Sequence, residues 1–331
     1  MHCELVIPSL FAAPRALRLP ALELLLARGR SSSEPSQSLE RWLADAFGLG
    51  DALPAGALTL LAGGGEPGES SWARADPVHL RLMRERLVLV PAAAFAISQL
   101  EAEALCASLN HHFKGVLELH PLEPQRWCAR LDEAFVIEAA APLEEAGRDV
   151  GLGTARAGAA GRLHAVLNEV QMLLHAHPVN EAREERGEPA INSLWLWGAG
   201  RLPAVAPAHW QGVLADDPVA LGLARSAGAR RRLLPESAAA WLERAPDDGR
   251  HLVVLDALRV PLALAQEPEY RERLAALERE WFAPLLAALR AGRIGMLSVH
   301  VPDAEPGASF ETVRGDLRRF WRRPRAIEHY A

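Results

Sequence analysis

The segment that decides the fold class runs from residue 251 to residue 301. Its first part, HLVVLDAL (251–258), is a short apolar run of the kind that forms a buried strand. EPEYRERLAALEREWFAPLLAALRAG (267–292) has apolar residues at helical spacing and ends in a glycine, as helices commonly do. RIGMLSVHV (293–301) is a second apolar strand. Strand, helix and strand in this order predict a layered α/β sheet.

The same alternation extends outward from this segment. CELVIPSLF (3–11) predicts a buried first strand, and PALELLLARGR (20–30) a helix that follows it. RLHAVLNEVQMLLHAH (162–177) has the apolar spacing of an amphipathic helix. INSLWLWGAG (191–200) predicts a strand that places Trp195 and Trp197 on one face and ends in a glycine turn.

Shorter signals predict where other elements begin. Ser38 is expected to cap a helix, and Ser98 with Glu101 fits the capping box of another. The three serines at 31–33 are expected in a polar loop, and AFVIEA (134–139) as a strand.

Composition limits the function classes. The chain has 331 residues, half of them hydrophobic, which suffices for one large or two moderate domains. A net charge of −6 argues against a general nucleic-acid binder, because such proteins present positive charge to phosphates. The sequence has no export signal and no run near the roughly 18 apolar residues that span a bilayer. We therefore expect a cytoplasmic protein.

Motifs for metal or nucleophilic chemistry are weak. The three cysteines are widely spaced and form no C-x-x-C pair, so neither a disulfide framework nor a zinc site is indicated. His111 and His112 are adjacent, and Asp76 precedes His79, but no H-x-x-x-H pair occurs. No G-x-S-x-G nucleophile motif is present either. The glycine turn at 198–200 could present backbone N–H groups to an anion, although a plain strand end is the simpler interpretation.

The carboxy-terminal stretch DLRRFWRRPR (316–325) interleaves arginines with two aromatic residues. We expect a terminal helix that docks Phe320 and Trp321 on the core and exposes its arginines. The alternative is direct DNA binding, in which the aromatics stack on bases and Arg322 and Arg323 contact phosphates.

HPVNEAREERGEPAINSLWLWGAG (177–200) resembles a stretch of the archaeal-type cofactor-independent phosphoglycerate mutases, members of the alkaline phosphatase superfamily. RADPVHLR (74–81), LNHHF (109–113) and RFWRRP (319–324) look like a bacterial branch described as RpfE-type regulatory proteins. The resemblance extends over nearly the whole chain.

This resemblance implies a three-layer α/β/α sandwich of the alkaline phosphatase type that carries an inserted α+β domain. The core would consist of residues 1–71 and 190–331, and the insert of residues 72–189.

The family uses two divalent metals, held by Asp and His, and a serine that carries the phosphoryl group. This chain departs from that pattern. VIPSLFAAPRA (6–16) lacks the acids implied after the first strand, Asp256 remains without its histidine, and Val299 precedes His300 where an aspartate is implied. We therefore expect no catalytic residues, no metal and no cofactor.

The segment at 177–200 resembles the family closely, although most of the family's metal ligands are absent from this sequence. We predict a non-catalytic regulatory or binding protein whose partner is a phosphorylated or other anionic metabolite, or another protein. The predicted ligand-binding residues are Asp76, His79, His177, Asn180, Arg183, Asn192, Trp195, Trp197, Gly198 and Gly200. The alternative is a metal-dependent phosphoglycerate mutase or phosphotransferase with rearranged ligands drawn from Asp76, His79, His111, His112, Asp256 and His300.

Overall fold

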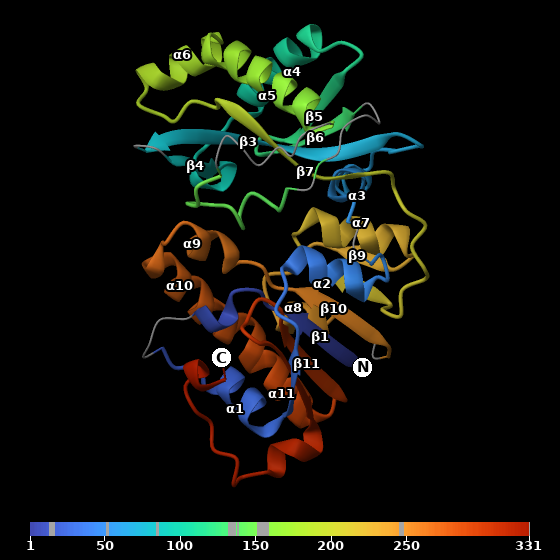
Figure 1. The fold of residues 1–331 in the computed structure, drawn as a ribbon. Helices are drawn as coiled ribbons and strands as arrows, with labels where there is room; N and C mark the ends of the chain where they lie inside the picture. Colours follow the sequence, from blue (N-terminus) through green and yellow to red (C-terminus); the bar gives the residue numbers. More distant parts are fainter. Residues whose placement is uncertain are drawn as a thin grey trace. The chain divides into compact units, whose positions relative to one another are not determined.

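The structure, a computed structural model, divides into two compact units (Figure 1). The core unit comprises Met1–Leu49 and Val205–Ala331, and the inserted unit comprises Gly50–Ala204. The described residues are 1–12, 17–50, 53–83, 86–131, 137, 139–150, 159–244 and 248–330. None of the helices in these ranges is long and apolar enough to cross a membrane.

The core unit is built on a sheet of seven strands in the order β2-β12-β11-β1-β10-β8-β9. Neighbours from β11 to β9 are parallel, whereas β12 and β2 pair antiparallel. The predicted buried strands appear as β1, β10 and β11. The strand bounds are β1 His2–Val6, β2 Arg30–Glu34, β8 Gly212–Leu214, β9 Arg230–Arg232, β10 Arg250–Val254, β11 Met296–Val301 and β12 Gly307–Val313.

Helices cover both faces of this sheet. On one face, apolar residues of α1, α8, α10 and α11 pack with alternate strand residues such as Leu5 and Val253. On the other face, the ring of Trp42 from α2 lies 5.3 Å from that of His300, whose neighbours Val299 and Val301 point into the first core. These two helix layers and the sheet form the expected α/β/α arrangement. The helix bounds are α1 Pro20–Arg28, α2 Leu39–Ala46, α7 Pro218–Ser226, α8 Ala238–Leu242, α9 Arg259–Ala263, α10 Glu267–Leu277 and α11 Ala283–Ala291.

The long helix predicted at 267–292 consists of α10, a π-helical turn at Glu278–Phe282 and α11. Its predicted glycine end is confirmed, because Gly292 has a left-handed φ of 78°. The predicted caps at Ser38 and Ser98 are also confirmed.

Two predictions in the core unit are wrong. Residues 31–33 are not a loop but part of edge strand β2, which pairs with β12. Its exposed polar residues gave no strand pattern, because an edge strand without a buried face shows no alternation. The tail forms a short 3₁₀ turn, Arg314–Arg318, and Phe320 and Trp321 are 77% and 66% exposed rather than docked.

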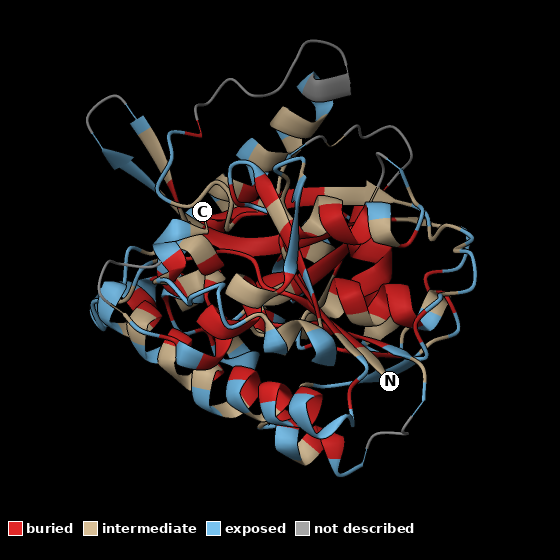
Figure 2. Ribbon diagram, turned by 90° about the horizontal axis from the view of Figure 1, so that it is seen from below, coloured by how far each residue is buried: buried red, intermediate tan, exposed pale blue. Residues whose placement is uncertain are grey.

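The inserted unit is a five-stranded sheet in which β3 is central. Helices α4 and α5 pack on one face, against residues such as Leu194 and Leu196, while α3 contacts the opposite face. Figure 2 shows buried positions on the sheet-facing sides of helices and exposed positions outward. The bounds are α3 Ala55–Ala62, β3 Ser71–Met83, β4 Arg86–Pro91, α4 Gln99–His112, β5 Leu117–Glu123, β6 Arg126–Leu131, α5 Ala159–His175, α6 Pro178–Glu185 and β7 Ser193–Gly200.

The bounds of this unit differ from the predicted insert of 72–189. Strand β7, expected in the core, pairs antiparallel with β3 from Trp72 to Val78. Helix α3 packs so closely on β3 that a Cβ at Gly56 would lie 2.3 Å from the backbone of Ala73. Both elements therefore belong to the inserted unit. The strand predicted at 134–139 lies mostly outside the described residues.

Candidate functional site

The carboxyl ends of the parallel strands are the place where open α/β sheets bind ligands. In the core unit, Ser9 follows β1, Asp256 follows β10, and Asp303 follows β11. Asp216 and Asp217 follow β8. This edge of the sheet therefore gathers one serine and several carboxylates.

Ser9 is fixed in a conformation that non-glycine residues seldom adopt. Its φ is 66°, and its backbone N–H donates to both carboxylate oxygens of Asp303 at 2.8 Å. Its hydroxyl donates to the same carboxylate at 3.2 Å, and the hydroxyl of Tyr270 donates to the Ser9 carbonyl at 2.6 Å. Nothing in the sequence around Ser9 indicated these contacts.

Asp256 lies in a partly buried environment close to other carboxylates. Burial, and then the charge of Asp217, raise the pKa of Asp256 to about 6, although Arg259 opposes the shift. The nearby Arg259 is engaged by Glu40 of α2, with 2.7 Å between guanidinium and carboxylate and both side chains largely buried. The positive charge of Arg259 is thus largely matched within the protein.

These carboxylates do not fit a two-metal centre. Asp217 accepts the Ala220 N–H at 2.8 Å as the cap of α7, and Asp216 accepts the Leu234 N–H at 3.2 Å. Asp303 is occupied by Ser9, as described above. Within the described ranges, no group of three or more His, Cys, Asp or Glu residues is placed to hold a metal ion. Val299, in the position where the sequence resemblance implies an aspartate, is 2% exposed in the apolar core.

Asp76 and Trp197, two of the predicted ligand-binding residues, meet across β3 and β7. The indole N–H of Trp197 donates to Asp76 at 2.7 Å. Arg74, which the sequence did not single out, donates to the other oxygen of Asp76 from Nε at 3.1 Å and lies 5.4 Å from the centre of the Trp197 ring. All three side chains are buried, so the Asp76 charge is compensated inside the fold.

Asn180 and Arg183 of α6 make internal hydrogen bonds. The Asn180 amide donates to the carbonyls of Leu174 and Ile191 and accepts the Ile191 N–H at 2.8 Å. Arg183 is 0% exposed and donates to the carbonyls of Pro189 and Ala96 and to Glu101. Both side chains join α6 to the strand and helix beside it.

His177 caps α6, with Nδ1 accepting the Val179 N–H at 3.2 Å and Nε2 lying 2.9 Å from the Ser108 hydroxyl. Burial lowers the pKa of His177, so the neutral ring that can accept this hydrogen bond is favoured.

The remaining predicted residues lie along β3 and β7. His79 contacts the Ala190 carbonyl at 2.8 Å, Asn192 bonds both backbone groups of Leu80, and Trp195 donates to the Ala140 carbonyl.

The glycines of the turn make room for α3. A Cβ on Gly198 would lie 2.5 Å from that of Ala55, and one on Gly200 would lie 3.1 Å from that of Pro54. Packing thus explains the glycine pattern, and a ligand role for the ten predicted residues stays a prediction.

The alternative metal set is divided between the two units. Asp76, His79, His111 and His112 belong to the inserted unit, whereas Asp256 and His300 belong to the core unit. His112 pairs with Glu169 at 3.2 Å on the surface, and His300 lies 3.5 Å from Glu34.

Together the two units define a mixed α/β protein whose parallel sheet carries acids and a serine at its carboxyl edge. Its fold is similar to that of the PH0037 protein from Pyrococcus horikoshii, with a TM-score of 0.58 and 15% identity over 94% of this chain and 87% of that one. The cofactor-independent phosphoglycerate mutase from Thermoplasma acidophilum aligns over 95% of this chain and 90% of its own, with a TM-score of 0.43 and 18% identity.

A local sequence match relates part of the chain to the same enzymes. Over 50 residues it is 42% identical to the probable 2,3-bisphosphoglycerate-independent phosphoglycerate mutase of Geobacter sulfurreducens. This match covers 15% of the chain and 12% of that relative. No family model matches the chain.

Proposed function

We propose that this protein is a non-catalytic relative of the cofactor-independent phosphoglycerate mutases, of the regulatory bacterial type that its sequence resembles. It acts in the cytoplasm as a regulatory or binding protein for an anionic metabolite or a protein partner. One observation carries the proposal. At the carboxyl edge of the core sheet, Asp216, Asp217 and Asp303 accept hydrogen bonds from backbone N–H groups or from Ser9.

Phosphoryl transfer by two metals depends on charge, because the metals activate the nucleophile and neutralise the phosphoryl oxygens. A metal site of this kind needs several ionised ligands that converge on one point. Here Asp217 and Asp216 accept backbone N–H groups, and Asp303 accepts three hydrogen bonds from Ser9. Asp256, with a pKa of about 6, binds its proton more tightly than an ordinary aspartate. These features support the absence of metal-dependent turnover.

Ser9 is the residue that a catalytic interpretation would choose as nucleophile. Its hydroxyl donates to Asp303, and its backbone is held by the same carboxylate, so its contacts are those of a turn that closes β1. The Arg259 guanidinium, which could bind a phosphate, is paired with Glu40. The Ser9 hydroxyl and the Arg259 guanidinium are thus both bound by carboxylates of the protein itself.

The test is phosphomonoesterase activity of the full chain on p-nitrophenyl phosphate with Mn²⁺, Zn²⁺ or Mg²⁺ added, together with metal analysis of the purified protein. The proposal predicts no release above that of the Ser9→Ala variant and no stoichiometric metal. Release that depends on metal and is lost in Ser9→Ala would establish the alternative phosphotransferase and overturn the proposal.

A further inference from the structure

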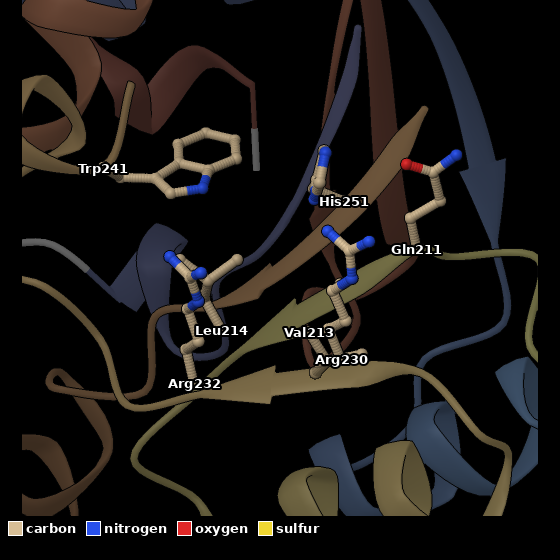
Figure 3. A pocket seen from close by; sticks show the side chains of 8 residues that line it. Gln211, Val213, Leu214, Arg230, Arg232, Trp241 and His251 are labelled. Carbon is tan, nitrogen blue, oxygen red and sulfur yellow. The ribbon is translucent and has the colours of Figure 1, made fainter. Parts of the chain in front are cut away.

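A small hollow lies in the core unit, on the face of the sheet that α8 covers. The hollow opens to solvent where β8, β9 and β10 meet α8, and the space between its lining residues, open solvent included, is about 330 Å³ (Figure 3). Gln211 precedes β8, whereas the carboxylates Asp216 and Asp217 follow that strand at its other end. The lining residues are Gln211, Gly212, Val213, Leu214, Arg230, Arg232, Trp241 and His251.

Two arginines give the hollow its charge. Arg230 and Arg232 are alternate residues of β9, so their side chains leave the strand on the same face. Figure 3 shows both extending to the side of the sheet on which His251 and Trp241 lie. The lining contains no carboxylate, and neither guanidinium forms an ion pair with any carboxylate that the structure describes. Two guanidiniums that form no ion pair with a carboxylate of the described ranges favour an anion of charge −2 beside this hollow.

His251 adds a buried group that is not satisfied by the fold. The residue is 4% exposed, and its Nε2 has no hydrogen-bond partner among the described residues. Burial, followed by the charges of the amino terminus, Arg230 and Arg232, lowers the pKa of His251, so the ring is neutral. The backbone of Asp248 also interacts with the ring and raises its pKa, against the net shift. A neutral ring carries one proton, and in the tautomer with that proton on Nδ1 the Nε2 atom presents a lone pair that accepts a hydrogen bond.

We propose that this hollow binds a small phosphate monoester that carries a hydroxyl group, with the phosphate on Arg230 and Arg232 and the hydroxyl donating to Nε2 of His251. A buried polar atom without a partner is costly, and a ligand hydroxyl would remove that cost. The hollow opens to solvent, so the ligand would be only partly enclosed, and Trp241 supplies an apolar wall. The two arginines and His251 play no part in the function proposed above. The hollow would therefore exist whether or not the carboxyl edge of the sheet is catalytic.

The test is calorimetric titration of the full chain with 2-hydroxyethyl phosphate in low-salt buffer at pH 7.5. We expect one site, and a loss of affinity of about tenfold or more in Arg230→Gln and in Arg232→Gln, because each removes a charged hydrogen-bond donor. Arg231→Gln is the matched control, since Arg231 lies on the same strand but on the opposite face. It should bind like the wild type.

Two further ligands separate the parts of the proposal. Ethyl phosphate, which lacks the hydroxyl, should bind about fivefold more weakly than 2-hydroxyethyl phosphate because it cannot donate to His251. Malate, a hydroxylated dicarboxylate, should bind more weakly still. Equal affinity for the two phosphates would overturn the role of His251, and tighter binding of malate would overturn the assignment to phosphate.

Other outcomes would overturn the site itself. They are the absence of binding to the wild type at millimolar concentration, or an equal loss of affinity in Arg231→Gln. Neither outcome bears on turnover at the carboxyl edge, so a failure here is distinguishable from a failure of the proposed function.

Discussion

Arg183 donates to Glu101 at 3.2 Å and is completely buried between α6 and α4. The same carboxylate receives Arg186 at 2.8 Å, but that guanidinium is 48% exposed. Both arginines also lie within ion-pair distance of Glu188, at 3.4 Å and 2.9 Å, so they share their partners and differ in burial. They are therefore a matched pair for testing whether Arg183 supports the fold or binds a ligand.

We predict that Arg183→Met lowers the free energy of unfolding by about 3 kcal/mol, because it removes a buried charge that compensates Glu101 and satisfies two carbonyls. Arg186→Met should cost less than about 1 kcal/mol. Chemical denaturation of both variants measures the difference. A stable Arg183→Met variant that loses anion binding would show instead that Arg183 is a ligand residue.

The contact between Trp197 and Asp76 provides a second test. Trp197→Phe leaves one oxygen of a buried carboxylate without its donor, so we expect a loss of about 2 kcal/mol. Trp195 lies on the same face of β7, and Trp195→Phe removes its hydrogen bond to the carbonyl of Ala140, a less buried residue. We expect this variant to lose less stability. Thermal unfolding compares them, and equal losses would contradict a special role for the Asp76 contact.

The turn that closes β1 predicts a smaller effect. Asp303→Ala removes the acceptor of the Ser9 N–H and should destabilise the protein by about 1 kcal/mol, since Asp303 is itself exposed. Glu305→Ala, two residues on and also exposed, is the control. A neutral Asp303→Ala variant would mean that Ser9 keeps its positive φ without this carboxylate.

Asp256 predicts the direction of a pH dependence. Its pKa of about 6 lies above its ordinary value, so the folded state binds the proton more tightly than the unfolded state. This favourable contribution is complete below about pH 4 and is lost as the pH rises through 6. Asp256→Asn should therefore be more stable than the wild type at pH 7.5, and the difference should shrink towards pH 4.5. A destabilised variant at pH 7.5 would indicate that the ionised carboxylate is needed.

The tail predicts a negative result with DNA. Arg319 and Arg322 donate to the carbonyls of Arg28 and Gly29, so two of the arginines are engaged, and the net charge is −6. We expect the fluorescence anisotropy of a labelled duplex to stay constant at low salt. Binding that weakens with salt and in Arg322→Gln would favour the DNA alternative.

Local signals in the sequence were sufficient to predict the central strands of the core unit and several of its helices. Apolar runs gave β1, β10 and β11, and side-chain chemistry gave the caps at Ser38 and Ser98. The edge strand β2 was missed because its residues are exposed and polar. The assignment of β7 to the inserted unit depends on pairing with β3, more than 100 residues earlier, and short-range patterns carry no such information.

The candidate sites were harder to predict for the same reason. The positive φ of Ser9 and its bond to Asp303 arise from chain segments 294 residues apart. The residues predicted as ligands from 177–200 include side chains whose partners, such as Glu101 and Asp76, lie on other elements. His251 stands in an ordinary apolar strand, and only the sheet order, with β8 between β10 and β9, brings Arg230 and Arg232 into the lining of the same hollow.

The most direct test of the central claim is the interconversion of 3-phosphoglycerate and 2-phosphoglycerate, followed by ³¹P NMR with Mg²⁺ or Zn²⁺ present. The wild type, Ser9→Ala and Asp256→Asn should all leave the substrate unchanged, because the carboxyl edge of the core sheet does not fit the two metals that the reaction needs. Turnover by the wild type that depends on metal and is lost in either variant would contradict the account.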